Sequence, residues 1–155
     1  MLKSMIAVAL AVLLSGAAAA QAPAEVVFRN VRVFDGKSDR LTAPTSVLVR
    51  GNLIAAIGPA AVATAPTVTV VEGEGRTLMP GLIDAHWHTL LVRPRFTELL
   101  TVDVGYLNVL GAAEATATLM RGFTTVRDVG GPAFGLKRAI DEGVLPGPRI
   151  YPSGA

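Results

Sequence analysis

The first half of the chain alternates short runs of β-branched and apolar residues with turn-forming residues. Runs of about four to eight such residues, bounded by Gly, Asn, Asp or Pro, are typical of β-strands. Gly51-Asn52 separates two of these runs and is a two-residue hairpin signal. The expected strands are Val26–Phe34, Ser46–Val49, Leu53–Ile57, Thr67–Val71 and Arg76–Met79. Short strands at such close spacing predict a small β-sandwich.

The second half changes to an alternation of strands and helices. Apolar residues recur at helical spacing, at Tyr106, Val109, Leu110, Ala113, Ala117 and Met120. Gly122 follows where a helix commonly ends in a left-handed residue. Buried-type strands are predicted at Phe123–Val129 and Arg149–Ser153, with a second helix at Ala133–Glu142 closed by Gly143. This order requires parallel strands joined by right-handed crossovers, so the fold class is α/β.

Between the two patterns, an apolar run ends in His86-Trp87-His88, which contains both histidines of the protein. On a β-strand, His86 and His88 point to one face and Trp87 to the other. Their Cα atoms then lie about 6.6 Å apart, which lets both imidazoles reach one ion. The spacing predicts that His86 and His88 are metal ligands and that Trp87 packs in a core. A pair of structural histidines is the alternative.

The residues around this pair resemble a known family. The motif P-G-L-I-D-A-H-x-H at residues 80–88 is similar to the first-strand signature of the amidohydrolase superfamily, whose members are metal-dependent hydrolases. The motifs G-F-T-T-V-R-D at residues 122–128 and P-R-I-Y-P-S-G-A at residues 148–155 resemble its imidazolonepropionase-like and Xaa-Pro-dipeptidase-like branch. The resemblance implies a (β/α)8 TIM barrel preceded by a small β-sandwich.

The N-terminal pattern and this resemblance together divide the chain into three expected parts. These are a signal peptide at residues 1–22, the β-sandwich segment at residues 23–80, and the first three strands and two helices of the barrel at residues 81–155. A complete (β/α)8 barrel typically needs about 250 residues. We therefore expect an incomplete barrel, and the chain to be an N-terminal fragment of a longer enzyme.

The resemblance also implies a function. Relatives hydrolyse an amide, peptide or cyclic amide C–N bond with water activated by one or two divalent ions, most commonly zinc. His86 and His88 would hold the first ion, while the remaining ligands of such enzymes lie on strands beyond residue 155. We expect a peptidase-like parent enzyme acting on a small-molecule or peptide substrate, and a 155-residue chain that is inactive alone. The alternative is a non-catalytic exported remnant or a small metal-binding module.

Three other positions carry weaker signals, and none is assigned as catalytic. Asp84 is either a hydrogen-bond partner that orients an imidazole or a structural carboxylate at the bottom of the barrel. Asp128 either faces the substrate or belongs to a turn, residues 128–132, that caps the next helix, and the cap is favoured. Arg93-Pro94-Arg95 could meet an acidic substrate but is more typical of a solvated loop.

The N-terminus predicts export. Lys3 precedes an apolar core at Met5–Leu14, and small residues allow cleavage after Ala20 or Ala22. The core is shorter than the roughly 20 residues of a membrane-spanning helix, so no stable anchor is expected after cleavage. The expected location is the periplasm or the medium.

The charge of the chain does not indicate a nucleic-acid partner. Cleavage would lower the formal net charge from +2 to +1, because Lys3 is the one charged residue that is lost, and so small a charge does not favour binding to nucleic acid. The sequence does not fix an oligomeric state.

Overall fold

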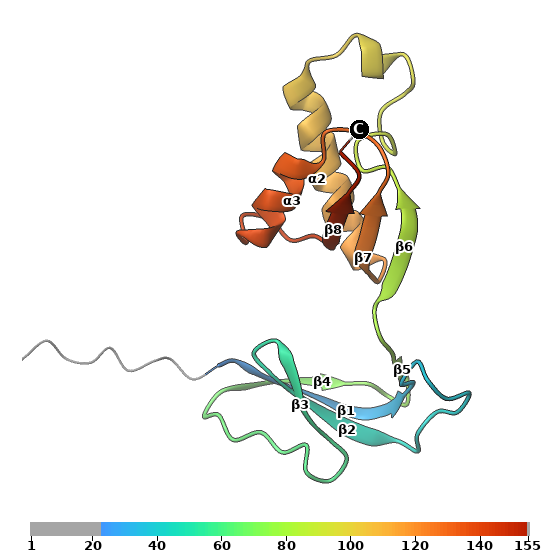
Figure 1. Cartoon of the computed structure of the whole chain (residues 1–155). Helices are drawn as coiled ribbons and strands as arrows, with labels where there is room; N and C mark the ends of the chain where they lie inside the picture. Colours follow the sequence, from blue (N-terminus) through green and yellow to red (C-terminus); the bar gives the residue numbers. More distant parts are fainter. Residues whose placement is uncertain (1–22, 155) are drawn as a thin grey trace, which may run out of the picture. The chain divides into compact units, whose positions relative to one another are not determined.

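A computed structural model describes residues 23–154 of the 155-residue chain. The chain divides into two compact units between Leu78 and Met79. The predicted signal peptide lies outside the described residues. Within residues 23–154, no helix has both the length and the apolar character needed to cross a membrane. Each unit is described by itself below (Figure 1).

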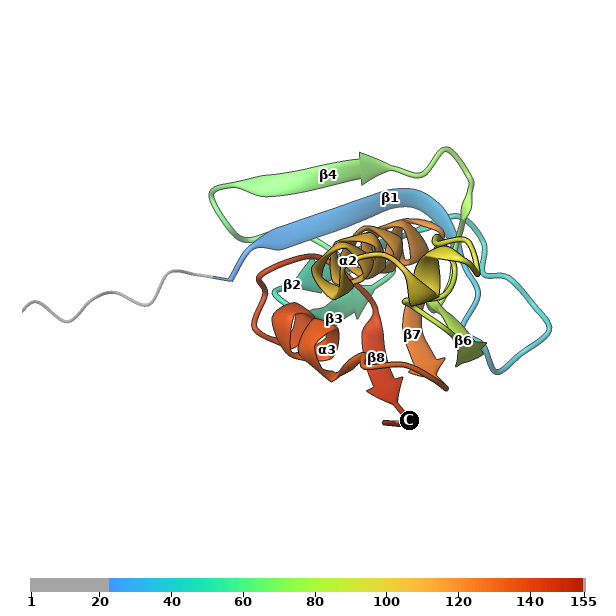
Figure 2. The same cartoon turned by 90° about the horizontal axis from the view of Figure 1, so that it is seen from above.

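The first unit is one mixed β-sheet. Its strands are β1 (Glu25–Val33), β2 (Thr45–Arg50), β3 (Leu53–Ile57), β4 (Val68–Glu72) and β5 (Thr77–Leu78). The order is β3-β2-β1-β4, and the short β5 pairs with the end of β1. The β1–β2 and β2–β3 pairs are antiparallel, whereas β4 and β5 run parallel to β1. Figure 2 shows β4 alongside β1.

The five predicted strands of this unit are confirmed, but not the way they were expected to assemble. Residues 23–78 form a single sheet, and the second layer of the predicted sandwich is not found within them. Its small core consists of Val27, Leu48 and Ala61, the last from the loop after β3. The hairpin at Gly51 forms as predicted, and the φ of 60° at that residue explains why glycine is favoured there.

The second unit has the predicted strand–helix alternation. Its elements are β6 (Leu82–Trp87), the short 3-10 helix η1 (Glu98–Leu100), α2 (Val104–Met120), β7 (Phe123–Asp128), α3 (Phe134–Asp141) and β8 (Arg149–Pro152). The strands pair in parallel in the order β6-β7-β8. Gly122 follows α2 with a φ of 95°, which confirms the predicted helix end. This unit is an open segment of an α/β fold, not a closed barrel.

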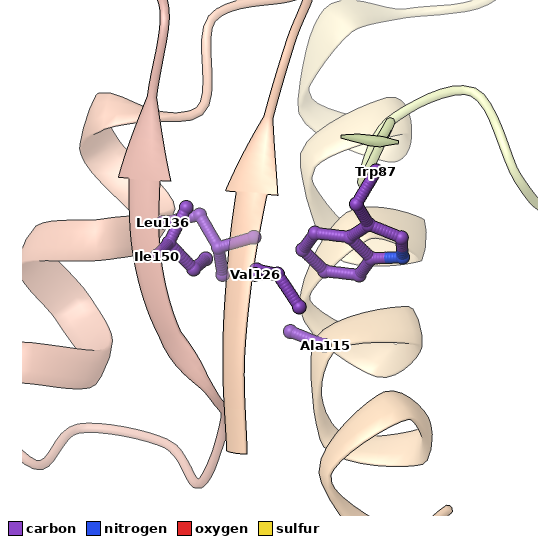
Figure 3. Packing of buried hydrophobic residues seen from close by; sticks show 5 residues of the cluster. All are labelled: Trp87, Ala115, Val126, Leu136 and Ile150. Carbon is purple, nitrogen blue, oxygen red and sulfur yellow. The ribbon is translucent and has the colours of Figure 1, made fainter. Parts of the chain in front are cut away.

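The core of the second unit lies between the sheet and its two helices. Trp87, Val126 and Ile150 come from the three strands and meet Ala115 of α2 and Leu136 of α3 in one buried cluster (Figure 3). The predicted packing of Trp87 against a helix is thus confirmed. The other face of the sheet is open, and Ile83 is 71% exposed there. Parallel sheets are normally covered on both faces.

Candidate metal-binding site

The strand that carries the histidines is not regular. Asp84 pairs with Val126 and Trp87 pairs with Asp128, so two residues of β6 lie opposite one residue of β7. This is a β-bulge, which bends a strand and changes the direction of its side chains. Simple alternation along β6 is therefore interrupted just before the strand ends at Trp87. His88 follows as the first residue of the loop.

The two imidazoles nevertheless lie together. Their ring centroids are 5.2 Å apart and the ring planes make an angle of 69°. The Nδ1 atom of His88 is buried and has no hydrogen-bond partner within residues 23–154. A buried polar nitrogen without a partner is costly, and a cation bound there would satisfy it. The donor set fits a divalent ion that prefers nitrogen ligands, such as zinc.

The described residues supply only part of such a site. No group of three or more His, Asp or Glu side chains that could hold a metal occurs among residues 23–154. Catalytic zinc sites usually have three protein ligands. His86 and His88 therefore constitute a half-site, and their assignment as ligands stays a prediction.

Asp84 acts on the backbone and not on an imidazole ring. Its Oδ1 atom accepts a hydrogen bond of 3.0 Å from the backbone N–H of His86. This bond spans the bulge, so Asp84 helps to fix the irregular backbone from which the first imidazole projects. Of the two roles expected for Asp84, the structure shows the structural hydrogen bond.

Asp128 is buried at the end of β7 and joins two loops. Its Oδ2 atom accepts hydrogen bonds from the backbone N–H of Thr89, at 3.1 Å, and from the Thr89 hydroxyl. Its Oδ1 atom accepts from the backbone N–H of Gly130 at 3.1 Å. The N-cap of α3 is Ala133, so the expectation that Asp128 caps this helix is wrong, although its side chain does hold the turn before it. Only 1% of Asp128 is exposed, so its carboxylate is directed into the protein.

The loop after His88 is also anchored to α2. Leu90 packs against Gly111, where an added Cβ would lie 2.4 Å from the Leu90 Cδ2 atom. Arg93 donates from Nε to the buried carboxylate of Glu114 at 2.7 Å, and Arg121 pairs with the same carboxylate. Arg93 thus lies in an exposed loop, as the sequence favoured, and this ion pair ties its guanidinium to α2.

The electrostatics of Glu114 follow from these two contacts. Burial alone would raise the pKa of its carboxyl group, but hydrogen bonds and charge from Arg121 and Arg93 outweigh burial and lower the pKa. Glu114 is thus an ionised anchor that ties the loop after the histidines to the helix behind it.

Thr89 and Glu114 were not expected to be important from the sequence. Thr89 is completely buried and stands directly after His88, but its partner Asp128 is 39 residues away along the chain. Two signals in the sequence could have been combined to predict this contact. Thr89 is a hydroxyl residue next to a candidate ligand, and Asp128 is an acid at the end of the following parallel strand.

Comparison with known proteins shows the family. The sequence profile of the amidohydrolase family matches residues 77–155, which include the whole described second unit. The chain belongs to this family, as the resemblance of its motifs implied.

Among curated proteins, the chain is similar to adenine deaminases. It is 32% identical over 110 residues to that of Paracoccus denitrificans, which covers 70% of this chain and 16% of the relative. With that of Mesorhizobium japonicum it shares 40% identity over 67 residues, covering 43% of this chain and 11% of the relative. The chain therefore spans less than a fifth of the length of these relatives.

Among solved structures, the chain is similar to amidohydrolases and prolidases. An amidohydrolase shares 30% identity with a TM-score of 0.72, covering 84% of this chain and 31% of that structure. A prolidase in complex with N-methylphosphonate-L-proline shares 31% identity with a TM-score of 0.71, covering 84% and 32%. A Xaa-Pro dipeptidase with bound methionine shares 29% identity with a TM-score of 0.70, covering 84% and 33%.

Proposed function

We propose that this chain supplies two metal ligands, His86 and His88, to a hydrolase that cleaves a C–N bond. The observation that carries the proposal is the pair of adjacent imidazoles with a buried, unpartnered Nδ1, at the carboxyl end of the first strand of the unit that matches the amidohydrolase family. Active sites of (β/α)8 barrels lie at this end of the strands.

A divalent ion, most commonly zinc, would supply Lewis-acid polarisation of the substrate and activation of water when bound. The residues of this chain would form part of the binding site for that ion. The imidazoles of His86 and His88 bind, Asp84 fixes the backbone N–H of His86, and Trp87 anchors the strand in the core. One or two ions are expected in the complete site.

The proposed substrate is a small molecule or peptide with an amide-like bond, and the enzyme is peptidase-like. Support comes from the solved prolidase and Xaa-Pro dipeptidase, which match across 84% of this chain at about 30% identity. The adenine deaminases offer a second candidate, an exocyclic C–N bond on a purine, but the matched part covers at most 16% of those proteins. Under either candidate function, His86 and His88 are the ligands that we propose this chain supplies.

The proposal assigns this chain a part of the enzyme and not the whole of it. Two nitrogen ligands fall short of a catalytic zinc site, and the open face of β6-β7-β8 leaves apolar side chains exposed. We therefore propose that residues 1–155 bind zinc weakly and hydrolyse nothing alone. We also propose that the predicted leader directs export of the protein to the periplasm or the medium.

The test is a zinc titration of the purified chain followed by NMR of the histidine rings. The protein has only two histidines, so each ring signal can be assigned by one substitution. We expect both signals to shift together in the wild-type chain, and binding to be lost in His86→Ala and His88→Ala. Glu142→Gln, which removes an exposed carboxylate directly after α3, is the control and should bind as the wild type does.

Activity is measured on the same samples with a Xaa-Pro dipeptide and with adenine. We expect neither to be consumed by the 155-residue chain. Zinc binding that survives both histidine substitutions would contradict the assignment of ligands. Tight stoichiometric zinc together with amide hydrolysis by the purified chain would contradict the half-site.

A further inference from the structure

We propose that Asp128 is a positioning residue for the metal site: acting through Thr89, it fixes the backbone from which the imidazole of His88 projects. The inference rests on the proposed function, because it concerns how a proposed ligand is held. It is carried by a separate set of contacts, which connect the ends of β6 and β7.

Asp128 is itself firmly held by the sheet. Its backbone carbonyl accepts a hydrogen bond of 2.8 Å from the N–H of Ser153, directly after β8. The N–H of the next residue, Val129, donates to the carbonyl of Trp87 at 2.9 Å. The carboxylate therefore extends from a backbone fixed on both sides by neighbouring strands. It can transmit that rigidity to the loop it contacts.

The contact with Thr89 has two donors on one acceptor atom. The backbone N–H and the side-chain hydroxyl of Thr89 both donate to Oδ2 of Asp128. Thr89 and Asp128 are both buried, so no water competes for these bonds. Two bonds to one residue fix the rotation of its backbone as well as its position. Because Thr89 is covalently next to His88, the direction of the His88 Cα–Cβ bond is constrained as well.

The imidazole of His88 needs such an anchor. In metal sites, the orientation of a histidine ligand is usually set by a hydrogen bond to the ring nitrogen that does not bind the metal. Before a cation binds at the buried Nδ1 of His88, no hydrogen bond from residues 23–154 to that atom holds the ring in place. The ring orientation is then determined by the backbone and by packing, and Asp128 governs the backbone.

Substitutions can separate the two bonds. In Asp128→Asn, one of the two side-chain oxygens becomes an N–H₂ donor, which must face either the N–H of Thr89 or that of Gly130 and cannot accept from it. Thr89→Val keeps the β-branched shape and the backbone N–H but removes the hydroxyl. Thr89→Ser restores the hydroxyl with less packing volume.

The experiment measures zinc affinity and ring geometry in the 155-residue chain. Zinc is titrated while the two histidine ring signals are followed by NMR, and the nuclear Overhauser effect between the rings is recorded before zinc is added. Loss of an outer hydrogen-bonding partner typically weakens metal affinity by about 10–100-fold. We expect at least a tenfold loss for Asp128→Asn, a several-fold loss for Thr89→Val, and wild-type affinity for Thr89→Ser. The inter-ring effect should weaken in the same order.

The matched control is Thr118→Val, which makes the same change at another buried threonine of the second unit, one whose hydroxyl contacts Glu114 and Arg121 and not Asp128. It should lose stability yet keep the zinc affinity and the inter-ring effect. Equal weakening in Thr118→Val and Thr89→Val would overturn the proposal, because general loosening would then explain both. Wild-type affinity in Thr89→Val would overturn it directly.

Two further results remain decisive. If Asp128→Asn does not fold, the comparison of Thr89→Val with Thr89→Ser gives the answer, because both keep the carboxylate. If the wild-type chain binds no zinc at all, the proposed function fails, and the inter-ring effect in Thr89→Val still tests the positioning role. An unchanged inter-ring effect in that variant would then contradict it.

Discussion

Each unit contains an almost completely buried carboxylate that holds a loop, but the two carboxylates are satisfied in different ways. In the first unit, Glu25 accepts hydrogen bonds from the backbone N–H groups of Thr64 and Ala65, at 2.7 and 2.9 Å. It also forms an ion pair with Arg50 at 2.8 Å. Glu25 therefore combines charge compensation with backbone hydrogen bonds, and it attaches the long loop after β3 to the start of β1.

In the second unit, Asp128 has no ion pair among residues 23–154 and accepts only from N–H and hydroxyl donors. One of its partners, Thr89, stands next to a candidate metal ligand. The loop held by Glu25 contains no such residue. A buried carboxylate thus serves the fold in one unit and the candidate site in the other, and the residues next to its partners decide which.

The largest loss of stability is expected when the largest side chain of the second unit's core is truncated. Trp87→Ala should destabilise this unit by about 3–5 kcal/mol, because it leaves a large cavity between β6 and α2. Hydrogen exchange measured by NMR should show loss of protection at the amide of Thr89. The amide of Ala65, held by Glu25, should stay protected, because Trp87 belongs to the core of the other unit.

If Trp87→Ala lowers the protection of the Thr89 and Ala65 amides equally, the contacts of Asp128 and Glu25 are not independent of each other. Leu136→Ala is the milder control, because it removes a smaller side chain of the same cluster from α3. It should weaken protection at Thr89 less than Trp87→Ala does, and leave Ala65 unchanged.

Acid should weaken the contact of Glu25 with the backbone of Thr64 and Ala65. The hydrogen bond from Ala65 and the Arg50 guanidinium lower the pKa of Glu25 to about 2 from its ordinary value of 4.5. A lowered pKa in the folded state gives stability that is fully present above pH 4.5 and is lost as the pH falls toward 2. The protection factor of the Ala65 amide should therefore fall across this range.

Glu25→Gln removes the titrating group. Its Ala65 protection factor should be lower than that of the wild type at neutral pH and nearly independent of pH below 4.5. Asp35 also has a lowered pKa, because the backbone N–H groups of Ser38 and Lys37 donate to it, so Asp35→Asn is the control. A wild-type acid response in Glu25→Gln would show that another group is responsible.

The parts of this fold that were predictable depend on local signals. The bounds expected for β3, Leu53–Ile57, are those observed, and the turns at Gly51, Gly122 and Gly143 each have the positive φ for which glycine is suited. Parallel pairing in the second unit followed from the strand–helix alternation, because short loops cannot join parallel strands. These features are encoded within a few neighbouring residues.

The remaining features depend on contacts between distant residues. The parallel pairing of β4 with β1 joins residues about 40 positions apart, and no turn signal specifies it. The bulge in β6 results from its register with β7, which the alternation of His86 and His88 on an ideal strand does not reveal. The proximity of the two imidazoles was expected from their spacing, whereas the contact of Thr89 with Asp128 required the two strand ends to be placed together.

A matched pair of glycine substitutions tests whether packing on α2 holds the loop that contains Thr89. Gly111 and Gly135 both lie in helices, but a Cβ at Gly111 would lie 2.4 Å from Leu90 and 3.5 Å from Thr89, whereas nothing lies within 4 Å at Gly135. Alanine in a helix is otherwise favoured over glycine by about 0.5–1 kcal/mol. Gly135→Ala should therefore stabilise the unit by this amount.

Gly111→Ala should lose that gain, because Leu90 and the loop it belongs to must move. We expect a net destabilisation of about 1 kcal/mol, measured by urea denaturation, and faster hydrogen exchange at the Thr89 amide. If Gly111→Ala is as stabilising as Gly135→Ala and leaves Thr89 protected, the loop after His88 is not held by its packing on α2.

The smallest effect is expected where a carboxylate is exposed. The Arg138 Nε to Glu142 Oε1 distance on α3 is 2.7 Å, equal to that between Arg93 Nε and Glu114 Oε2. The side chain of Glu142 is 52% exposed and that of Glu114 is 4% exposed. Exposed pairs at this spacing contribute about 0.3–0.5 kcal/mol, and salt screens them.

Glu142→Gln should therefore lower the free energy of unfolding by less than about 0.5 kcal/mol. Urea denaturation in high salt should show no difference from the wild type. Glu114→Gln should keep a larger deficit in the same salt, since burial and not distance sets the strength of these contacts. Equal salt-sensitive losses in the two variants would refute that conclusion.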